Sequence, residues 1–103
     1  MTCELEKLGG VIRVRGDMTI YDANLVKDAL FAALQGEPDV CIDLSGVSEV
    51  DTTGLQVLLM VHRACVSRGV PFSVAKLSDV MREALGLLRL GNLIPTVQLP
   101  AAP

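Results

Sequence analysis

Apolar positions along this chain recur with two different periods, and the changes of period outline the predicted elements. Residues 2–8 alternate between apolar and polar side chains, as a half-buried strand does. The Gly9-Gly10 pair can adopt positive φ and predicts a two-residue hairpin turn. Residues 11–15 alternate again and predict the returning strand. The chain is therefore expected to begin with an antiparallel hairpin.

Three longer segments carry apolar residues at helical spacing. Each is opened by a capping residue and closed by a glycine: residues 23–35 between Asp22 and Gly36, 52–68 between Asp51 and Gly69, and 79–90 between Ser78 and Gly91. The predicted buried faces are Val26, Ala29, Leu30, Ala33 and Leu34; Leu55, Leu58, Leu59, His62, Cys65 and Val66; and Val80, Met81, Ala84, Leu85 and Leu88.

Strands are predicted between these helices. Residues 39–44 are almost continuously apolar, which is typical of the middle of a parallel sheet. Residues 71–76 form another predicted strand, and the proline-interrupted residues 93–99 are expected to be an edge strand or an extended cover. With right-handed crossovers, this order predicts one α/β domain over residues 1–103: a small mixed sheet, made of the N-terminal hairpin plus parallel strands, packed by three to four helices, with a tail at 100–103.

Composition narrows the possible partners. Half of the residues are hydrophobic but only two phenylalanines and one tyrosine are aromatic, so the core must be aliphatic. A net charge of −3 with acids and bases interspersed argues against nucleic acid or an anionic membrane as the partner. The longest apolar run, Val57–Val61, is far shorter than the ~20 residues of a membrane span. The polar opening residues do not resemble a signal peptide, so we expect a cytoplasmic protein without membrane insertion.

The turn Asp51-Thr52-Thr53-Gly54 stands out. A turn at Ser45-Gly46 and a short loop are predicted to lead into it. Asp51 is predicted to be an N-cap whose carboxylate accepts a hydrogen bond from the free N–H of Thr53 or Gly54. Gly54 costs up to ~1 kcal/mol relative to alanine inside a helix, which suggests close approach of another backbone or of a partner. Thr52 and Thr53 then occupy the first helical positions with their hydroxyls free. On spacing alone, capping would be a sufficient role for this turn.

The surrounding sequence adds a resemblance. The run from Asp43 to Leu55, DLSGVSEVDTTGL, resembles the signature of STAS domains, the family of bacterial anti-sigma factor antagonists and of the cytoplasmic tails of sulfate transporters. In that family the residue after the aspartate is a serine or threonine phosphorylated by a partner kinase. By position this is Thr52, although modification of Thr53 stays open. The resemblance implies a STAS-like fold and a protein partner, either a kinase-fold anti-sigma factor or a related switch kinase.

A partner-binding surface can be outlined around Thr52. Gln56, Met60 and Arg63 are expected to form an exposed ridge below the turn, and an exposed methionine suits an adaptable contact. The Gly16-Asp17-Met18-Thr19 stretch matches the family's Gly-Glu-Leu-Asp pattern in part, with Thr19 where many members carry aspartate. The predicted partner-binding residues are Asp17, Thr19, Asp51, Thr52, Thr53, Gly54, Gln56, Met60 and Arg63.

Catalysis is not expected. The single histidine, His62, lies nearly three helical turns from Thr52 on the apolar face, where it is expected to be a packed residue. The glycines do not form a phosphate-binding loop. The cysteines, Cys3, Cys41 and Cys65, are odd in number and widely spaced, which indicates neither a disulfide framework nor a zinc site. We therefore expect a protein that is not an enzyme and has no cofactor or metal.

Three interpretations of function remain open. The first is a phosphorylation-controlled binding module in partner switching, with transcription regulation or a chemotaxis-type two-component circuit as its output. The second is a non-catalytic subunit of a membrane transporter, because the same run is similar to the STAS subunit of the bacterial phospholipid-trafficking ABC complex, which binds its ATPase. The third is a plain dimerisation domain, for which only Met60 suggests an exposed apolar patch.

Overall fold

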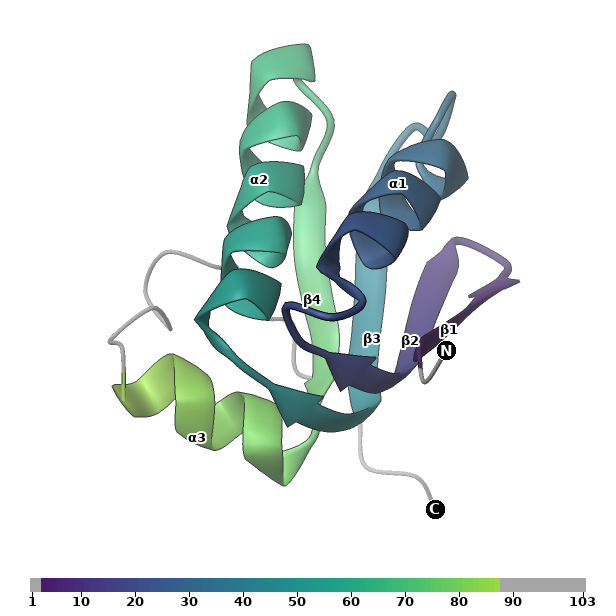
Figure 1. Cartoon of the computed structure of the whole chain (residues 1–103). Helices are drawn as coiled ribbons and strands as arrows, with labels where there is room; N and C mark the ends of the chain where they lie inside the picture. Colours follow the sequence, from purple (N-terminus) through teal and green to yellow (C-terminus); the bar gives the residue numbers. More distant parts are fainter. Residues whose placement is uncertain (1–2, 88–103) are drawn as a thin grey trace.

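A four-stranded mixed sheet organises residues 3–87, the part of the chain that this computed structural model describes (Figure 1). Its strands lie in the order β1-β2-β3-β4, with β1 antiparallel to β2 and both later pairs parallel. Gly9 has a φ of 61° in the hairpin turn, as predicted. The strands are β1 (Cys3–Leu8), β2 (Val11–Met18), β3 (Val40–Val50) and β4 (Phe72–Leu77).

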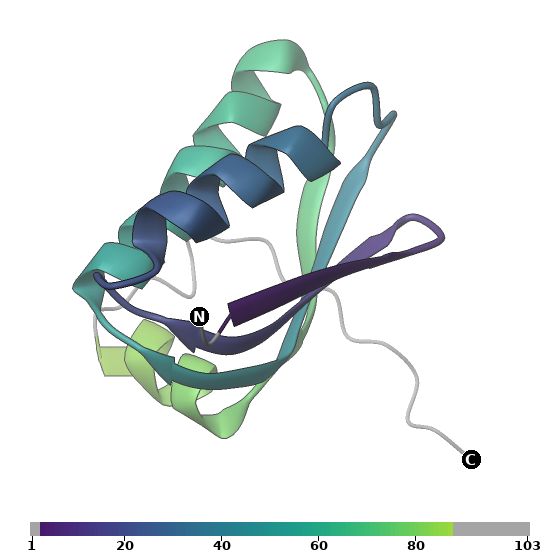
Figure 2. The same ribbon diagram turned by 45° about the vertical axis from the view of Figure 1, so that its right-hand side comes forward.

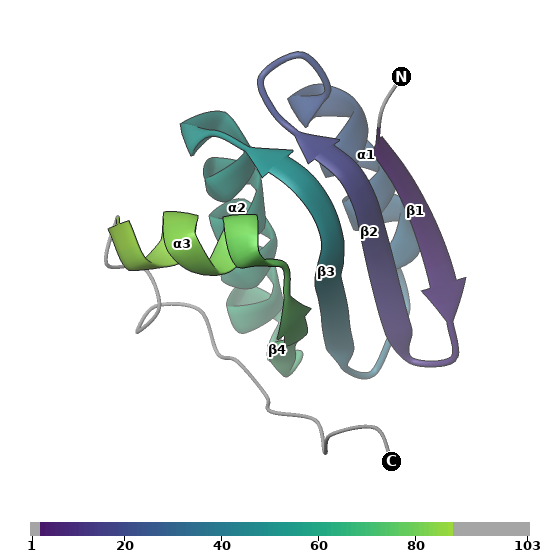
Figure 3. The same cartoon turned by 90° about the horizontal axis from the view of Figure 1, so that it is seen from below.

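Helices cover the sheet from two sides. The helices α1 (Ala23–Ala33) and α2 (Thr52–Arg68) lie side by side on one face, whereas α3 (Asp79–Leu87) packs against β3 on the side away from α1 (Figures 2 and 3). Within residues 3–87, none of these helices combines the length and the apolar character needed to cross a membrane. The predicted α/β architecture is confirmed for this part of the chain, and the predicted segments 93–99 and 100–103 lie outside it.

The strand β3 is longer than predicted. We expected it to end at Leu44 and to be followed by a turn and a loop, but it continues to Val50. The reason is that β2 also continues past the predicted residues 11–15, to Met18, and the two extensions pair with each other across bulges. The sequence did not predict this ladder, because polar side chains such as Ser45 interrupt the apolar pattern of the strand.

The core is aliphatic, as the composition requires. Its fully buried members come from every layer: Met18, Leu30, Ile42, Leu44, Leu58, Met81, Val14, Val61, Val74, Cys3 and Cys65. Two predicted core residues are exposed instead, Val66 by 66% and Val80 by 38%. Each lies at the margin of its helix's buried stripe, in the last turn of α2 and the first turn of α3, where the covering layer ends. Leu88 lies outside the described residues.

The predicted cap of the first helix is also wrong in part. Asp22 occupies the N-cap position of α1, but its side chain makes no capping hydrogen bond. Its backbone angles, φ −114° and ψ 1°, depart from the extended conformation that directs a capping side chain back to the helix N–H groups. The predicted end of α2 is confirmed, since Gly69 adopts the left-handed conformation with φ 70°.

Candidate functional site

One carboxylate organises the start of α2. Asp51 Oδ1 accepts a hydrogen bond from the N–H of Gly54 at 3.0 Å, which confirms the predicted cap. Its second oxygen, Oδ2, accepts from the N–H of Ile20 at 2.9 Å, in the loop between β2 and α1. This second bond was not predicted, because it joins residues 31 positions apart. Asp51 therefore ties the loop and the helix start into one surface.

Gly54 is required where β2 meets α2. A Cβ at this position would lie 2.0 Å from the carbonyl oxygen of Met18, far inside van der Waals contact. The same Met18 oxygen accepts a hydrogen bond from the N–H of Asp51 at 3.3 Å. The close approach expected at Gly54 is therefore the backbone of β2, and it holds the first turn of α2 against the sheet.

Thr52 is exposed at this helix start, whereas Thr53 is half-buried. A shallow groove of about 210 Å³ opens beside Thr52, lined by β3, by the first turn of α2 and by α3. Its lining residues are Val50, Asp51, Thr52, Leu55, Ala84 and Leu87. The Thr52 hydroxyl thus stands at the edge of a mostly apolar depression rather than on a flat polar surface.

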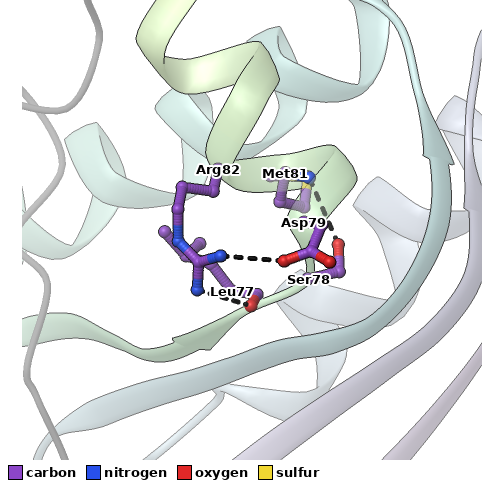
Figure 4. Close-up of polar contacts among 5 residues, drawn as sticks. All are labelled: Leu77, Ser78, Asp79, Met81 and Arg82. Atoms are coloured by element: carbon purple, nitrogen blue, oxygen red, sulfur yellow. Dashed lines mark hydrogen bonds and ion pairs between the residues drawn. The ribbon is translucent and has the colours of Figure 1, made fainter.

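The far wall of this groove is fixed by the cap of α3 (Figure 4). Ser78 Oγ accepts a hydrogen bond from the N–H of Met81 at 3.2 Å, as predicted. Arg82 donates to Asp79 at 2.9 Å and to the carbonyl oxygen of Leu77 at 3.5 Å. These contacts set the direction in which α3 leaves β4.

Exposed apolar side chains occur on the segments next to Thr52, in the loop bonded to Asp51 and at the end of α3. Ile20 is 64% exposed, Tyr21 is 90% exposed and Leu87 is 77% exposed. Sequence reasoning missed all three, although Ile20 and Tyr21, as large apolar residues in a short loop after a strand, are a usable signal. We call Ile20, Tyr21, Thr52 and Leu87, together with the groove, the Thr52 surface.

The predicted site residues lie in three places: at the start of α2, at the end of β2 and along the exposed side of α2. The helix start and the loop that follows Thr19 are brought together by Asp51, while Asp17 lies half-buried in β2, opposite Glu49. Thr19 is half-buried at the bend after β2, and its carbonyl oxygen accepts from the N–H of Asp22 at 3.0 Å. The remaining residues extend down the exposed side of α2: Gln56, Met60 and Arg63.

The local electrostatics favour an ionised aspartate beside Thr52. Desolvation alone would raise the pKa of the Asp51 carboxyl, but the N–H donors of Gly54 and Ile20 outweigh it and hold the pKa below 3.8. Asp51 is therefore negative at neutral pH. A second negative group on Thr52 would stand next to this charge.

Other reactive side chains are packed away from Thr52. The His62 ring stacks on Phe72 with centroids 5.0 Å apart, which confirms the prediction of a packed histidine. Burial raises the pKa of the Cys3 thiol to about 11, so this thiol stays protonated. Within residues 3–87, His, Cys, Asp and Glu side chains do not form a group of three that could hold a metal ion.

Comparisons with known proteins show the family and the fold of this chain. Residues 2–95 match the family model described as "Mlab, STAS domain". An anti-sigma factor antagonist from Mycobacterium paratuberculosis superposes with a TM-score of 0.78 at 24% identity, covering 95% of this chain and 86% of that one.

The anti-sigma factor antagonist SpoIIAA is also similar. Its unphosphorylated form gives a TM-score of 0.70 at 18% identity, covering 93% of this chain and 88% of that one. The phosphorylated form of the Bacillus protein gives 0.65 at 17% identity, covering 93% and 91%. At these identities the structural likeness establishes the fold.

Proposed function

Because this chain belongs to the STAS domain family, we propose that it is a protein-binding regulator that docks through the Thr52 surface. The observation that carries the proposal is the exposed Thr52 hydroxyl at the edge of an apolar groove, beside the ionised Asp51. Its partner would be a kinase-fold anti-sigma factor or a related switch kinase. Phosphorylation of Thr52 would control the affinity.

The control would be electrostatic. A phosphate on Thr52 adds about −1.5 to −2 charges and three acceptor oxygens. The N–H groups at the start of α2 and the helix dipole can accommodate this charge, so the fold should survive. A docked partner could not accommodate this charge, because a partner side chain in the groove would desolvate the phosphate beside Asp51. Phosphorylation should therefore weaken docking with little loss of stability.

The exposed apolar residues indicate how the partner would bind. A few residues near the centre of an interface, most often Trp, Tyr and Arg, supply most of its affinity. Tyr21 and Ile20 stand on the loop that Asp51 anchors, and Leu87 borders the groove. The partner would place its own apolar side chain against this set, with Gln56 and Arg63 as the polar margin and Met60 as an exposed apolar contact between them.

A substitution series tests the proposal. The protein would be used as bait in extracts of its native host, and the affinity of the captured partner would be measured by calorimetry. Thr52→Glu should weaken binding by roughly tenfold or more, equal to about 1.4 kcal/mol. Thr52→Val, which removes the hydroxyl, should retain binding. Ser67→Glu adds the same charge at the exposed far end of α2 and serves as the matched control.

The same apolar surface supports a second candidate function. Permanent interfaces are more apolar than transient ones, and Ile20, Tyr21 and Leu87 would suit a constitutive subunit. This corresponds to the transporter interpretation, in which the chain binds an ABC ATPase. Stable capture of such an ATPase, with Thr52 unmodified in the cell, would establish this function and contradict phosphorylation control. A dissociation constant that is unchanged by Thr52→Glu would contradict the role of the Thr52 surface itself.

A further inference from the structure

The strand β1 forms the outer edge of the described sheet, at the end opposite β4 (Figure 3). Within residues 3–87, β1 pairs with β2 alone, so its other side presents backbone N–H and C=O groups that point away from the sheet. Such an edge is able to pair with an added strand.

A groove runs along this edge, between β1 and α1. It measures about 420 Å³ and is lined mainly by apolar side chains. Cys3 and Val26 are buried at its base, whereas Leu25 is 56% exposed at its rim. The groove therefore offers apolar contact on the helix side of the edge. Its lining residues are Cys3, Glu4, Leu5, Leu25, Val26 and Ala29.

The opposite face of the edge carries Glu4 and Glu6 on its outermost strand, with Arg15 and Arg13 of β2 opposite them on the inner side. Because side chains alternate along a strand, Glu4 and Glu6 point away from the α1 side, and both are exposed. The Glu4 side chain is 73% exposed and lies 3.5 Å from Arg15. Lys7 points to the α1 side instead, where it donates to the carbonyl oxygen of Ala33 at 3.3 Å and pairs with Glu37. The open part of the edge is thus Cys3–Glu6.

We propose that this edge of β1 docks an extended segment of a partner protein in which apolar and basic residues alternate. Each apolar side chain would enter the groove beside Leu25, and each basic one would face Glu4 or Glu6 on the other side of the sheet. The added backbone would pair with β1 and extend the sheet by one strand.

A second copy of this chain is a poor occupant. If two β1 strands paired antiparallel with their buried faces aligned, Leu5 would lie opposite its counterpart. Glu4 of each copy would then lie opposite Glu6 of the other. Like charges directly opposite each other destabilise a strand pair. Charge complementarity therefore selects a basic partner strand.

This surface is separate from the Thr52 surface. β1 lies at one side of the sheet with α1 beside it (Figure 1), whereas the start of α2 packs against the end of β2, at Met18. The two surfaces share no residue, although Tyr21 of the Thr52 surface and Leu25 of the β1 groove are only four positions apart at the start of α1. Failure of one proposal would leave the other standing.

A peptide of alternating valine and lysine, carrying a fluorescent label, tests the proposal with the full chain. Fluorescence anisotropy in 0.15 M salt should show saturable binding, and NMR should place the shifted amides in β1 and α1. Glu4→Lys with Glu6→Lys should weaken binding by at least about tenfold and should favour a valine–glutamate peptide instead. Leu25→Lys should weaken binding of the valine–lysine peptide.

Controls separate strand addition from general charge attraction. Glu49→Lys with Glu83→Lys changes the net charge equally at exposed positions outside the groove lining, and should leave peptide affinity within about twofold. A peptide N-methylated at alternate residues should not bind, because it cannot pair with the edge. Equal effects of the two double variants, or amide shifts outside β1 and α1, would overturn the proposal. Self-association through β1 at NMR concentrations would also overturn it.

Discussion

Two aspartates of this chain show how local backbone decides what a side chain can do. Asp51 and Asp22 both precede helices, and both were predicted as caps. Asp51 has an extended backbone, φ −123° and ψ −176°, and its carboxylate reaches Gly54. Asp22 has a ψ of 1° and makes no capping bond. Residue type and spacing were identical signals, so only the folded backbone could distinguish the two positions.

Substitution of Asp51 by alanine should lower the free energy of unfolding, although the side chain that it removes is small. Asp51→Ala removes the α2 cap, worth about 1 kcal/mol and up to about 2 kcal/mol, and leaves the N–H of Ile20 without this acceptor. We expect the free energy of unfolding in urea to fall by about 1–2 kcal/mol. Asp28→Ala, on an exposed position of α1, is the control and should change it by no more than about 0.5 kcal/mol. Equal changes in the free energy of unfolding for Asp51→Ala and Asp28→Ala would contradict a stabilising role for the Asp51 cap.

A buried aspartate should link stability to pH. Asp43 is 4% exposed, and its Oδ1 accepts from the N–H and hydroxyl of Ser45 at 2.8 and 2.6 Å. Desolvation opposes ionisation, but these bonds and nearby Arg13 outweigh it and hold the pKa of Asp43 below 3.8. Since the folded pKa is the lower one, the carboxylate stabilises the fold above pH 3.8. That contribution is lost as the pH falls through the folded value.

We therefore expect Asp43→Asn to be less stable than the parent protein at pH 7. The difference should shrink as the pH falls below about 4. Urea unfolding between pH 2.5 and pH 7 measures it. A difference that stays constant over this range would mean that Asp43 acts through packing rather than through its charge.

At the scale of elements, the contact between β2 and α2 sets the position of the site. Gly54→Ala should raise helix propensity by up to about 1 kcal/mol, yet its Cβ would collide with the carbonyl oxygen of Met18. We expect a net destabilisation of about 1–3 kcal/mol, typical of overpacking. Gly86→Ala in α3 meets nothing within 4 Å and should stabilise by up to about 1 kcal/mol. Thermal unfolding of both variants provides the comparison, and a stabilised Gly54→Ala protein would contradict the close contact.

The elements themselves were largely predictable, because each rests on a local pattern. The presence of the three helices, the Gly69 stop and the Ser78 cap were predicted correctly, whereas the buried face of α2 also includes Val57 and Val61, which were not predicted. The late part of β3 was not predicted, since its polar residues form a strand only by pairing with β2, more than 25 positions away in the sequence. Non-local pairing of this kind leaves no periodic signal in either strand.

At the scale of the whole molecule, the Thr52 surface joins segments that the sequence keeps apart. Thr52 was identified from its motif, but the groove beside it needs α3, and the apolar rim needs the loop that Asp51 anchors. Periodicity could not predict either feature, because both depend on how α3 and the loop pack around the end of β3. The sequence therefore identified Thr52 alone, and the structure adds the groove and the exposed apolar residues of the Thr52 surface.

Tyr21 and Ile20 should supply much of the binding affinity of the Thr52 surface. Tyr21→Ala and Ile20→Ala each remove an exposed apolar side chain and should weaken partner binding by roughly tenfold or more, with little change in stability. Val66→Ala removes a comparably exposed side chain at the far end of α2 and should leave binding unchanged. Calorimetry with the captured partner measures all three. Equal effects at Val66 and at the loop would place the interface elsewhere.

Phosphate occupancy of Thr52 in the partner-bound and free pools of this protein tests the central claim most directly. Both pools would be isolated from the native host, and the peptide spanning Thr52 would be quantified by mass spectrometry. We predict phosphate on Thr52 in the free pool and little or none in the bound pool. Equal occupancy in the two pools, or a Thr52 that is unmodified under every growth condition, would contradict phosphorylation control of docking.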